Sequence, residues 1–173
     1  MTEKQPPYSI CVVGGGMVGL VAAMKVASIA KGSAAKVALI APRAQSPDPR
    51  TTAMMMPSID MLDDLGLWQA IKPLTAPLRT MRLIDGSKRL IRAPLTDFKA
   101  AEIGREAFGY NVPNAQMIAA MEAHIDETTS IVRFDAVADV RSTDADLVHL
   151  ALDTGEAVSA QLVVAADGRN SAI

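Results

Sequence analysis

The stretch that decides the fold is YSICVVGGGMVG at residues 8–19, an apolar run that breaks into Gly14, Gly16 and Gly19. This spacing is typical of a dinucleotide-binding turn, in which each glycine has its own task. Gly14 would allow the tight turn from strand to helix, Gly16 would let the backbone approach a pyrophosphate, and Gly19 would let the helix pack on the strand. The sequence therefore predicts a phosphate-binding turn that no side chain shields.

The residues on either side of the turn favour this interpretation over an ordinary glycine-rich loop. Ile10, Val12 and Val13 indicate a strand before the turn, residues 17–30 are rich in Ala, Val, Leu and Met, and residues 36–41 indicate a second strand. Together they form a βαβ unit. The N-terminus of its helix would offer unpaired N–H groups and a positive dipole end to the pyrophosphate.

Composition and charge limit the classes of protein that fit. The chain has 173 residues, half of them hydrophobic, and its net charge is 17 minus 19, or −2, which argues against a nucleic-acid partner. A secretory signal peptide is the competing interpretation of residues 10–24, but the three consecutive glycines and a start that is not basic argue against it. We expect no transmembrane segment, and the single cysteine, Cys11, fits a buried thiol in a reducing cytoplasm.

Residues 42–126 contain local patterns that predict a loop, helices and a hairpin. A loop over the ligand is expected at residues 42–57, which hold four prolines. Two short helices should follow at residues 58–65 and 67–71. A hairpin is expected next, with strands at 78–85 and 88–93 around the turn Asp85-Gly86-Ser87, and then a longer helix at 114–126.

The last third of the chain indicates a parallel strand, a β-meander and another parallel strand, at residues 131–134, 137–141, 147–153 and 162–165. The fold class is therefore α/β, a Rossmann-like parallel sheet with helices and a β-meander. Because the sequence stops at a strand-to-loop junction, we expect a truncated chain. Its expected parts are the first part of a nucleotide-binding domain at 1–76, the start of a substrate domain at 77–110, and a second part of the first domain at 111–173.

Four motifs in order give the chain a family resemblance. They are VVGGGMVG at residues 12–19, DPRTTAM at 48–54 followed by LDDLGLW at 62–68, VPNAQM at 112–117, and ADGRNS at 166–171. Together they resemble the N-terminal part of the class A FAD-dependent aromatic hydroxylases, closest to those of ubiquinone biosynthesis. The resemblance spans nearly the whole chain and implies a cytoplasmic flavoprotein that uses FAD and NADH or NADPH.

The resemblance also implies which residues bind the cofactor. Met17 and Val18 would add backbone N–H donors to the glycine turn, Arg50 would reach the flavin side, Asn114 would open a helix near the flavin, and the backbone of Val137 would meet adenine. Asp167 and Gly168 match the family's D-G motif, which helps to position FAD. Without the resemblance, Arg50 would be a solvated charge, Asn114 an N-cap and Asp167-Gly168 a common turn.

The chain departs from the family pattern at the end of the second strand. Ala41 stands where a carboxylate usually accepts hydrogen bonds from the ribose, so adenosine binding would depend on Arg43 or on backbone contacts. The downstream G-D motif that contacts the ribityl chain is also absent from this sequence.

The resemblance implies a reaction in which reduced FAD and O2 deliver one oxygen atom to an activated ring, here a polyprenyl phenol. No catalytic acid or base stands out, because His124 and His149 are isolated, and no metal-ligand spacing appears. Another FAD oxidoreductase, such as a halogenase or an oxidase, and a flavin-free fragment or interaction module are the alternatives. A peripheral membrane contact, a multi-enzyme complex and a homo-oligomer stay open.

Overall fold

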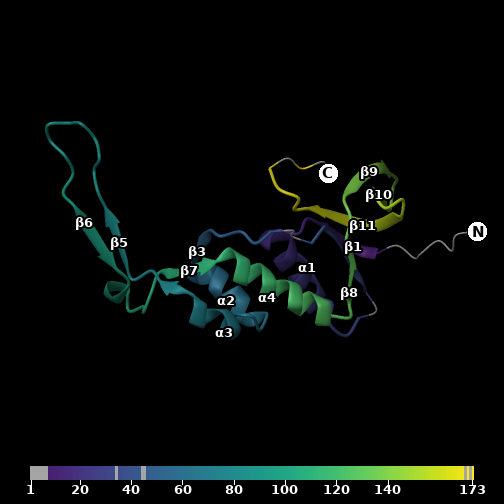
Figure 1. Ribbon diagram of the computed structural model, residues 1–173, viewed down its shortest axis with the longest axis horizontal. Coiled ribbons are helices and arrows are strands. Elements are labelled where there is room, and N and C mark those ends of the chain that lie inside the picture. The colour runs from purple at the N-terminus through teal and green to yellow at the C-terminus, as the bar shows by residue number, and fades with distance from the viewer. Residues whose placement is uncertain (1–7, 34, 44–45, 170, 172) are drawn as a thin grey trace, which may run out of the picture. The chain divides into compact units, whose positions relative to one another are not determined.

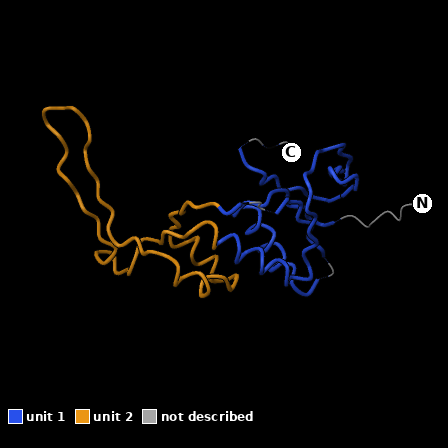
Figure 2. The backbone as a smooth tube through the Cα atoms, viewed as in Figure 1, with its two compact units in different colours: residues 1–47, 117–173 blue, residues 48–116 orange. Residues whose placement is uncertain are grey.

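The computed structural model describes residues 8–33, 35–43, 46–169, 171 and 173 (Figure 1). The chain divides into two compact units, one of residues 1–47 and 117–173 and the other of residues 48–116 (Figure 2). We call them unit 1 and unit 2 and describe each by itself. The three-part division expected from the sequence, with breaks after residues 76 and 110, stays a prediction.

Unit 1 is built on a six-stranded sheet in the order β8-β2-β1-β11-β10-β9. The strands are β1 (Tyr8–Val13), β2 (Val37–Ile40), β8 (Ile131–Phe134), β9 (Ala138–Thr143), β10 (Val148–Leu152) and β11 (Ala157–Ala165). Neighbours among β8, β2, β1 and β11 pair in parallel, whereas β9, β10 and β11 form an antiparallel meander. The predicted α/β fold with a parallel sheet and a meander is confirmed.

Strand β11 belongs both to the meander and to the parallel part of the sheet, which the sequence assigned to separate segments. β11 begins at Ala157, five residues before the strand expected at 162–165. Its first half closes the meander, with Val158 opposite Leu150 of β10, and its second half pairs in parallel with β1, with Val163 opposite Cys11. The meander therefore joins the parallel sheet without an intervening element.

Helix α1 (Met17–Ile29) buries one side of its surface and exposes the other. Its buried residues follow the spacing of one helical face: Gly19, Leu20, Ala23, Met24 and Ala27. Val18 and Ile29 are exposed on the other side. The predicted βαβ unit is thus present, with β1, α1 and β2 in sequence.

A hydrophobic cluster in unit 1 draws on both the parallel strands and the meander. Its members are Tyr8, Cys11, Val13, Ala38, Ile40, Ala136, Ala138, Leu150, Leu152, Val158 and Ala160. Tyr8 also meets Phe134 edge-to-face, with ring centroids 6.0 Å apart. Cys11 is fully buried, and this burial raises the pKa of its thiol to about 12. The cysteine is therefore a core residue, as the sequence indicated.

Unit 2 contains a three-stranded sheet, a hairpin and short helices. The sheet has the order β3-β7-β4, with β3 (Thr51–Met55), β7 (Gly109–Pro113) and β4 (Ala76–Pro77). Helices α2 (Met56–Asp64) and α3 (Trp68–Ile71) precede β4, and the 3-10 turns η1 (Lys72–Leu74) and η2 (Ala100–Ile103) flank the hairpin region. Helix α4 (Asn114–Glu127) starts in unit 2 and continues into unit 1.

Two local predictions in unit 2 were wrong. Residues 42–57 are not a loop throughout, because Thr51–Met55 form β3, which pairs with β7 from Thr51 opposite Pro113 to Met55 opposite Gly109. The hairpin has its return strand β6 at Thr96–Lys99, opposite β5 at Thr80–Leu83, and not at residues 88–93. The Asp85 carboxylate accepts hydrogen bonds from the backbone of Ser87 and Ala93, at 2.8 and 2.9 Å, and so holds these residues in a wide loop.

In the described part of the chain, no helix is long and apolar enough to cross a membrane.

Candidate functional site

The glycine turn between β1 and α1 is held by backbone contacts that leave no room for a side chain at Gly14. Gly14 has φ of +129° and is buried, and a Cβ atom there would overlap the carbonyl group of Ala166. Its N–H donates to the Ile40 carbonyl at 2.9 Å, and the Ala166 N–H donates to Val13 at 2.7 Å. These contacts place the turn at the carboxyl ends of β1, β2 and β11.

The other two glycines of the motif have the surroundings that a phosphate site requires. A Cβ atom at Gly19 would overlap the Gly14 carbonyl, so this position needs glycine for the helix to approach the strand. At Gly16 a Cβ atom would meet nothing within 4 Å. The first hydrogen bond of α1 runs from Leu20 N–H to the Gly16 carbonyl at 3.0 Å, so the N–H groups of Met17 and Val18 precede the helical ladder.

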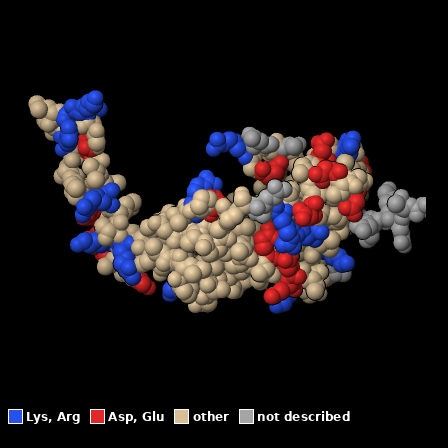
Figure 3. Space-filling model, in the orientation of Figure 1, with Lys and Arg blue, Asp and Glu red and all other residues tan. Residues whose placement is uncertain are grey.

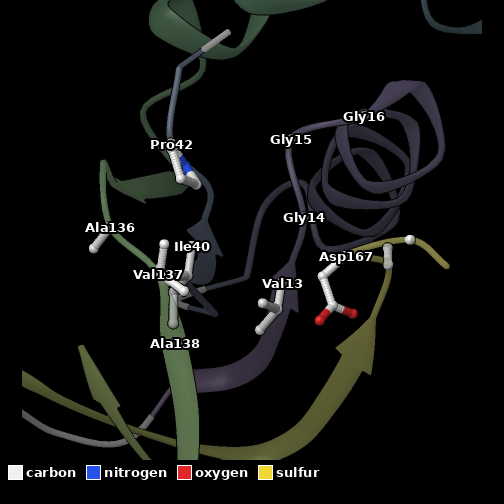
Figure 4. Close-up of a pocket in the computed structure, with 12 residues that line it drawn as sticks. Val13, Gly14, Gly15, Gly16, Ile40, Pro42, Ala136, Val137, Ala138 and Asp167 are labelled. Atoms are coloured by element: carbon white, nitrogen blue, oxygen red, sulfur yellow. The ribbon is translucent and has the colours of Figure 1, made fainter. Parts of the chain in front are cut away.

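A cavity of about 400 Å³ lies against this turn (Figure 4). Its lining comes from the carboxyl ends of the parallel strands and from the connection into β9: Val13, Gly14, Gly15, Gly16, Ile40, Pro42, Ala136, Val137, Ala138, Ala166, Asp167 and Gly168. In the close-up, Val13 lies between Val137 on one side and Asp167 on the other. The cavity sits where open α/β sheets bind ligands, outside the carboxyl ends of the strands.

Val137 and the Asp167-Gly168 pair enter this cavity from different elements. The backbone of Val137 is paired with Asp153: its N–H donates to the Asp153 carboxylate, and its carbonyl accepts from the Asp153 N–H, both at 3.0 Å. Each carbonyl oxygen has a second lone pair that an adenine amino group could use. Gly168 has φ of +95°, and the Ser171 hydroxyl donates to the Asp167 carboxylate at 2.6 Å.

Arg43 is tied to helix α4. Its guanidinium donates to Glu122 at 3.1 Å and to Asp126 at 2.6 Å. The bond to Asp126, followed by the charges of the neighbouring carboxylates, raises the pKa of Arg43. Glu122 also forms an ion pair with Arg133 of β8, and both of these side chains are largely buried, with exposed fractions of 15% and 10%. The side chain predicted to help with adenosine is therefore engaged in an ion-pair network within unit 1.

The predicted flavin-side residues Arg50 and Asn114 meet at one carboxylate in unit 2. The Asp48 carboxylate accepts hydrogen bonds from Arg50, from Nε to Oδ1 and from Nη2 to Oδ2, both at 2.8 Å. Its Oδ2 also accepts from Nδ2 of Asn114 at 2.9 Å. The bonds from Arg50 and then from Asn114 hold the pKa of Asp48 well below its usual range. Asn114 is buried and also accepts from the Thr52 hydroxyl at 2.7 Å.

Asp48 is a residue that the sequence reasoning did not single out. The only local signal is its position two residues before Arg50, where its carboxylate also accepts from the Arg50 backbone N–H at 3.0 Å. The bond from Asn114 crosses 66 residues of chain and could not be read from local spacing. Asp48 therefore sets the orientation of both predicted side chains.

The two histidines contact local partners. His149 lies on β10 between the Ser159 hydroxyl, 2.8 Å from Nδ1, and the Asp144 carboxylate, 2.9 Å from Nε2. His124 lies on α4, where its backbone carbonyl accepts from the Thr128 hydroxyl at 2.8 Å. Among the described residues, no group of three or more histidine, cysteine or acidic side chains could hold a metal ion.

The glycine turn and its cavity define a nucleotide-binding unit of the Rossmann type, and a family comparison identifies its class. Residues 7–173 match the model of the FAD binding domain family. The chain therefore belongs to the FAD binding domain family, and the predicted cofactor FAD is confirmed at the level of the family.

Two curated proteins are similar to the chain over nearly its whole length. One is 3-demethoxyubiquinol 3-hydroxylase of Escherichia coli K12, which is 33% identical over 96% of this chain and 43% of that protein. The other is the ubiquinone hydroxylase UbiL of Rhodospirillum rubrum, 28% identical over 95% of this chain and 38% of that protein. The predicted resemblance to ubiquinone hydroxylases is confirmed, and the chain spans less than half the length of these relatives.

A solved structure shares the fold. The flavin-dependent monooxygenase PieE, solved in complex with FAD and substrate, superimposes with a TM-score of 0.74 at 17% identity, over 98% of this chain and 31% of that one. The present chain thus shares its fold with about a third of that protein.

Proposed function

We propose that the chain is the cofactor-binding part of an FAD- and NAD(P)H-dependent monooxygenase that hydroxylates an aromatic ring. The observation that supports this most is the glycine turn, in which Gly16 opens onto the cavity while Gly14 and Gly19 are closed by backbone. A pyrophosphate fits such a turn, because it needs backbone N–H donors and no intervening side chain. Bound FAD would supply electron transfer and O2 activation.

The residues of the chain would bind and orient this cofactor. The N–H groups of Met17 and Val18 would donate to the pyrophosphate, and the Val137 carbonyl would accept from adenine. Asp167 lies at the opposite side of the cavity from Val137 in Figure 4, and it would contact the cofactor between its two ends together with Gly168, which also lines the cavity. In unit 2, Asp48 would hold Arg50 and Asn114 in the orientation for contact with the flavin side.

The substrate class that we propose is a polyprenyl phenol on the way to ubiquinone. The support is the similarity to two ubiquinone hydroxylases, at 33% and 28% identity. The test is to supply the complete gene product with FAD, NADH or NADPH and a polyprenyl phenol under 18O2. A product that gains one labelled oxygen supports the proposal. Retained flavin with reductant consumption but no labelled product would favour another FAD oxidoreductase, such as an oxidase or a halogenase.

We also propose that the hairpin β5–β6 contacts an anionic membrane surface. Its connecting loop exposes the apolar side chains Ile84, Leu90 and Ile91, at 70%, 101% and 86%. Lys88, Arg89 and Arg92 lie between and beside them, and basic side chains gather over the far end of the hairpin in Figure 3. Exposed apolar residues flanked by cations suit the interface of an anionic bilayer.

Vesicle sedimentation tests this contact directly. The protein should sediment with vesicles that contain anionic phospholipid and stay in solution with neutral vesicles. The double variant Leu90→Ser/Ile91→Ser should lose most of this binding, while Leu74→Ser, a matched loss of an exposed apolar side chain outside the hairpin, should keep it. Equal binding of both variants and the wild type would contradict the proposal.

A further inference from the structure

The carboxyl end of β2 offers no side-chain acceptor for a ribose hydroxyl. Ala41 follows β2 and is fully buried. Its Cβ atom faces the glycine turn, since a Cβ atom built on Gly15 would lie 3.1 Å from it. In the dinucleotide-binding fold an acidic side chain near this place accepts hydrogen bonds from the ribose. If the chain binds FAD, another acceptor has to take this task.

Arg43, two residues further on, does not supply such an acceptor. A guanidinium group only donates hydrogen bonds, and a ribose hydroxyl that binds it would have to act as the acceptor. Each terminal nitrogen of Arg43 also donates to a carboxylate, Nη1 to Glu122 and Nη2 to Asp126. Arg43 therefore does not replace the missing carboxylate.

Asp135 places a carboxylate at the same edge of the sheet. It directly follows β8, whose last residue, Phe134, is paired with Ile40 of β2. The Ala41 N–H donates to the Phe134 carbonyl at 2.9 Å, and the Arg43 N–H donates to Oδ1 of Asp135, also at 2.9 Å. The Asp135 carboxylate is therefore fixed against the segment where Ala41 lacks one.

The surroundings of Asp135 favour contact with a ligand. Its chain neighbours Ala136 and Val137 line the cavity, as does Pro42 on the facing segment. The residue is exposed, and the structure gives Oδ2 no hydrogen bond from any described residue. One oxygen is thus held by the Arg43 backbone, and the second is available to accept a hydrogen bond from a hydroxyl group.

We infer that Asp135 accepts a hydrogen bond from the adenosine ribose of FAD and so replaces the acidic side chain that is missing at Ala41. This inference rests on the proposed FAD binding. The carboxylate of the adenosine site has moved from the end of β2 to the end of β8, the adjacent parallel strand. Asp135 is thereby a cofactor-binding residue and not only a partner of the Arg43 backbone.

The test pairs a change in the protein with a change in the ligand. Quenching of flavin fluorescence gives the dissociation constants of FAD and of an FAD analogue whose adenosine ribose lacks both hydroxyls. Asp135→Asn keeps an acceptor for the Arg43 N–H but loses the charged acceptor for the ribose. We expect FAD to bind about tenfold more weakly to this variant, the effect of one charge-assisted hydrogen bond, and the analogue to bind both proteins equally.

Controls separate this inference from its alternatives. Asp139→Asn, which removes an exposed carboxylate four residues further along the chain, should leave both constants unchanged. The wild type alone should bind FAD about tenfold more tightly than the analogue, a comparison that needs no folded variant.

Three results would overturn the inference, and they have different meanings. If Asp135→Asn binds FAD as the wild type does, the inference fails and the proposed function stands. If the variant binds FAD and the analogue equally more weakly, Asp135 acts only through the segment that contains Arg43. If the wild type binds no FAD, both the inference and the proposed function fail.

Discussion

Gly14 and Gly16 lie in the same turn, yet a methyl group would meet different surroundings at each. At Gly14 it would overlap the backbone of Ala166, and the φ of +129° is one that an L-residue rarely adopts. At Gly16 it would enter open space beside the cavity, and the backbone there has φ of −77°. The fold therefore requires the first glycine, whereas the second is the one that we propose lets the ligand approach the backbone.

A pair of variants should separate these roles. Gly14→Ala should lower the free energy of unfolding by at least about 3 kcal/mol, because it combines backbone strain with overlap. Gly16→Ala should change that free energy by less than about 1 kcal/mol but weaken FAD binding about tenfold or more. Urea unfolding and flavin fluorescence titration measure the two effects. Unchanged FAD affinity in Gly16→Ala would contradict the placement of the FAD pyrophosphate at the glycine turn.

At the residue scale, the sequence predicted what depends on local spacing and missed what depends on tertiary partners. The three glycines could be assigned because their roles follow from the motif at residues 14–19 and from the strand directly before it. Asp48 and Asp135 could not, since each owes its role to a partner 66 or 92 residues away in the sequence. The Arg43 side chain was expected near adenosine, but the sequence around it does not indicate its ion pairs with Glu122 and Asp126.

At the element scale, the largely buried ion pair between Arg133 of β8 and Glu122 of α4 makes the stability of unit 1 sensitive to the loss of either partner. Arg133 donates to both carboxylate oxygens of Glu122 and, at 3.3 Å, to the Ala41 carbonyl, while its Nε has no partner among the described residues. A largely buried guanidinium that lost Glu122 would stay desolvated without a counter-charge.

Removal of one partner should therefore cost more than removal of both. Glu122→Leu should lower the free energy of unfolding by about 3 to 5 kcal/mol, and the added change Arg133→Met should recover most of that loss. Asp126→Asn, which removes a half-exposed partner of Arg43, should cost no more than about 1 kcal/mol. Chemical denaturation of the four proteins checks this, and a double variant no more stable than Glu122→Leu would contradict it.

The turn between β9 and β10 gives a prediction for acid stability. Asp144 accepts from His149 and from the backbone of Asp146 and Leu147, and these bonds lower its pKa to about 2. A pKa that folding lowers makes a contribution that is present above the unfolded value, about 3.9, and is lost as the pH falls to about 2. The melting temperature of the wild type should therefore fall in this window, and that of Asp144→Asn should fall less. Parallel curves for the two proteins would contradict this role.

The elements that were predicted well are those whose signal lies within the element. The apolar run of β1, the helical face of α1 and the run of β2 are each visible in a window of a few residues. β3 was missed because the prolines and threonines around it are typical of a loop, and because its partner β7 lies some 58 residues later in the sequence. The hairpin was placed by its turn residues, but the hydrogen bonds of Asp85 widen the loop beyond them.

At the scale of the whole molecule, the chain carries the complete glycine turn and cavity but less than half the length of its relatives. Every residue that lines the cavity belongs to unit 1, which is built from both ends of the chain. We therefore expect these residues by themselves to form the flavin site.

The visible absorption spectrum of the purified chain shows whether these residues hold flavin. FAD is added and the excess is removed by gel filtration, and Gly16→Ala is treated in parallel. We expect a flavin band that stays with the wild-type protein and is weakened in the variant. A wild-type protein that emerges without flavin, while its thermal unfolding shows that it is folded, would contradict the claim that the glycine turn and its cavity form the FAD site.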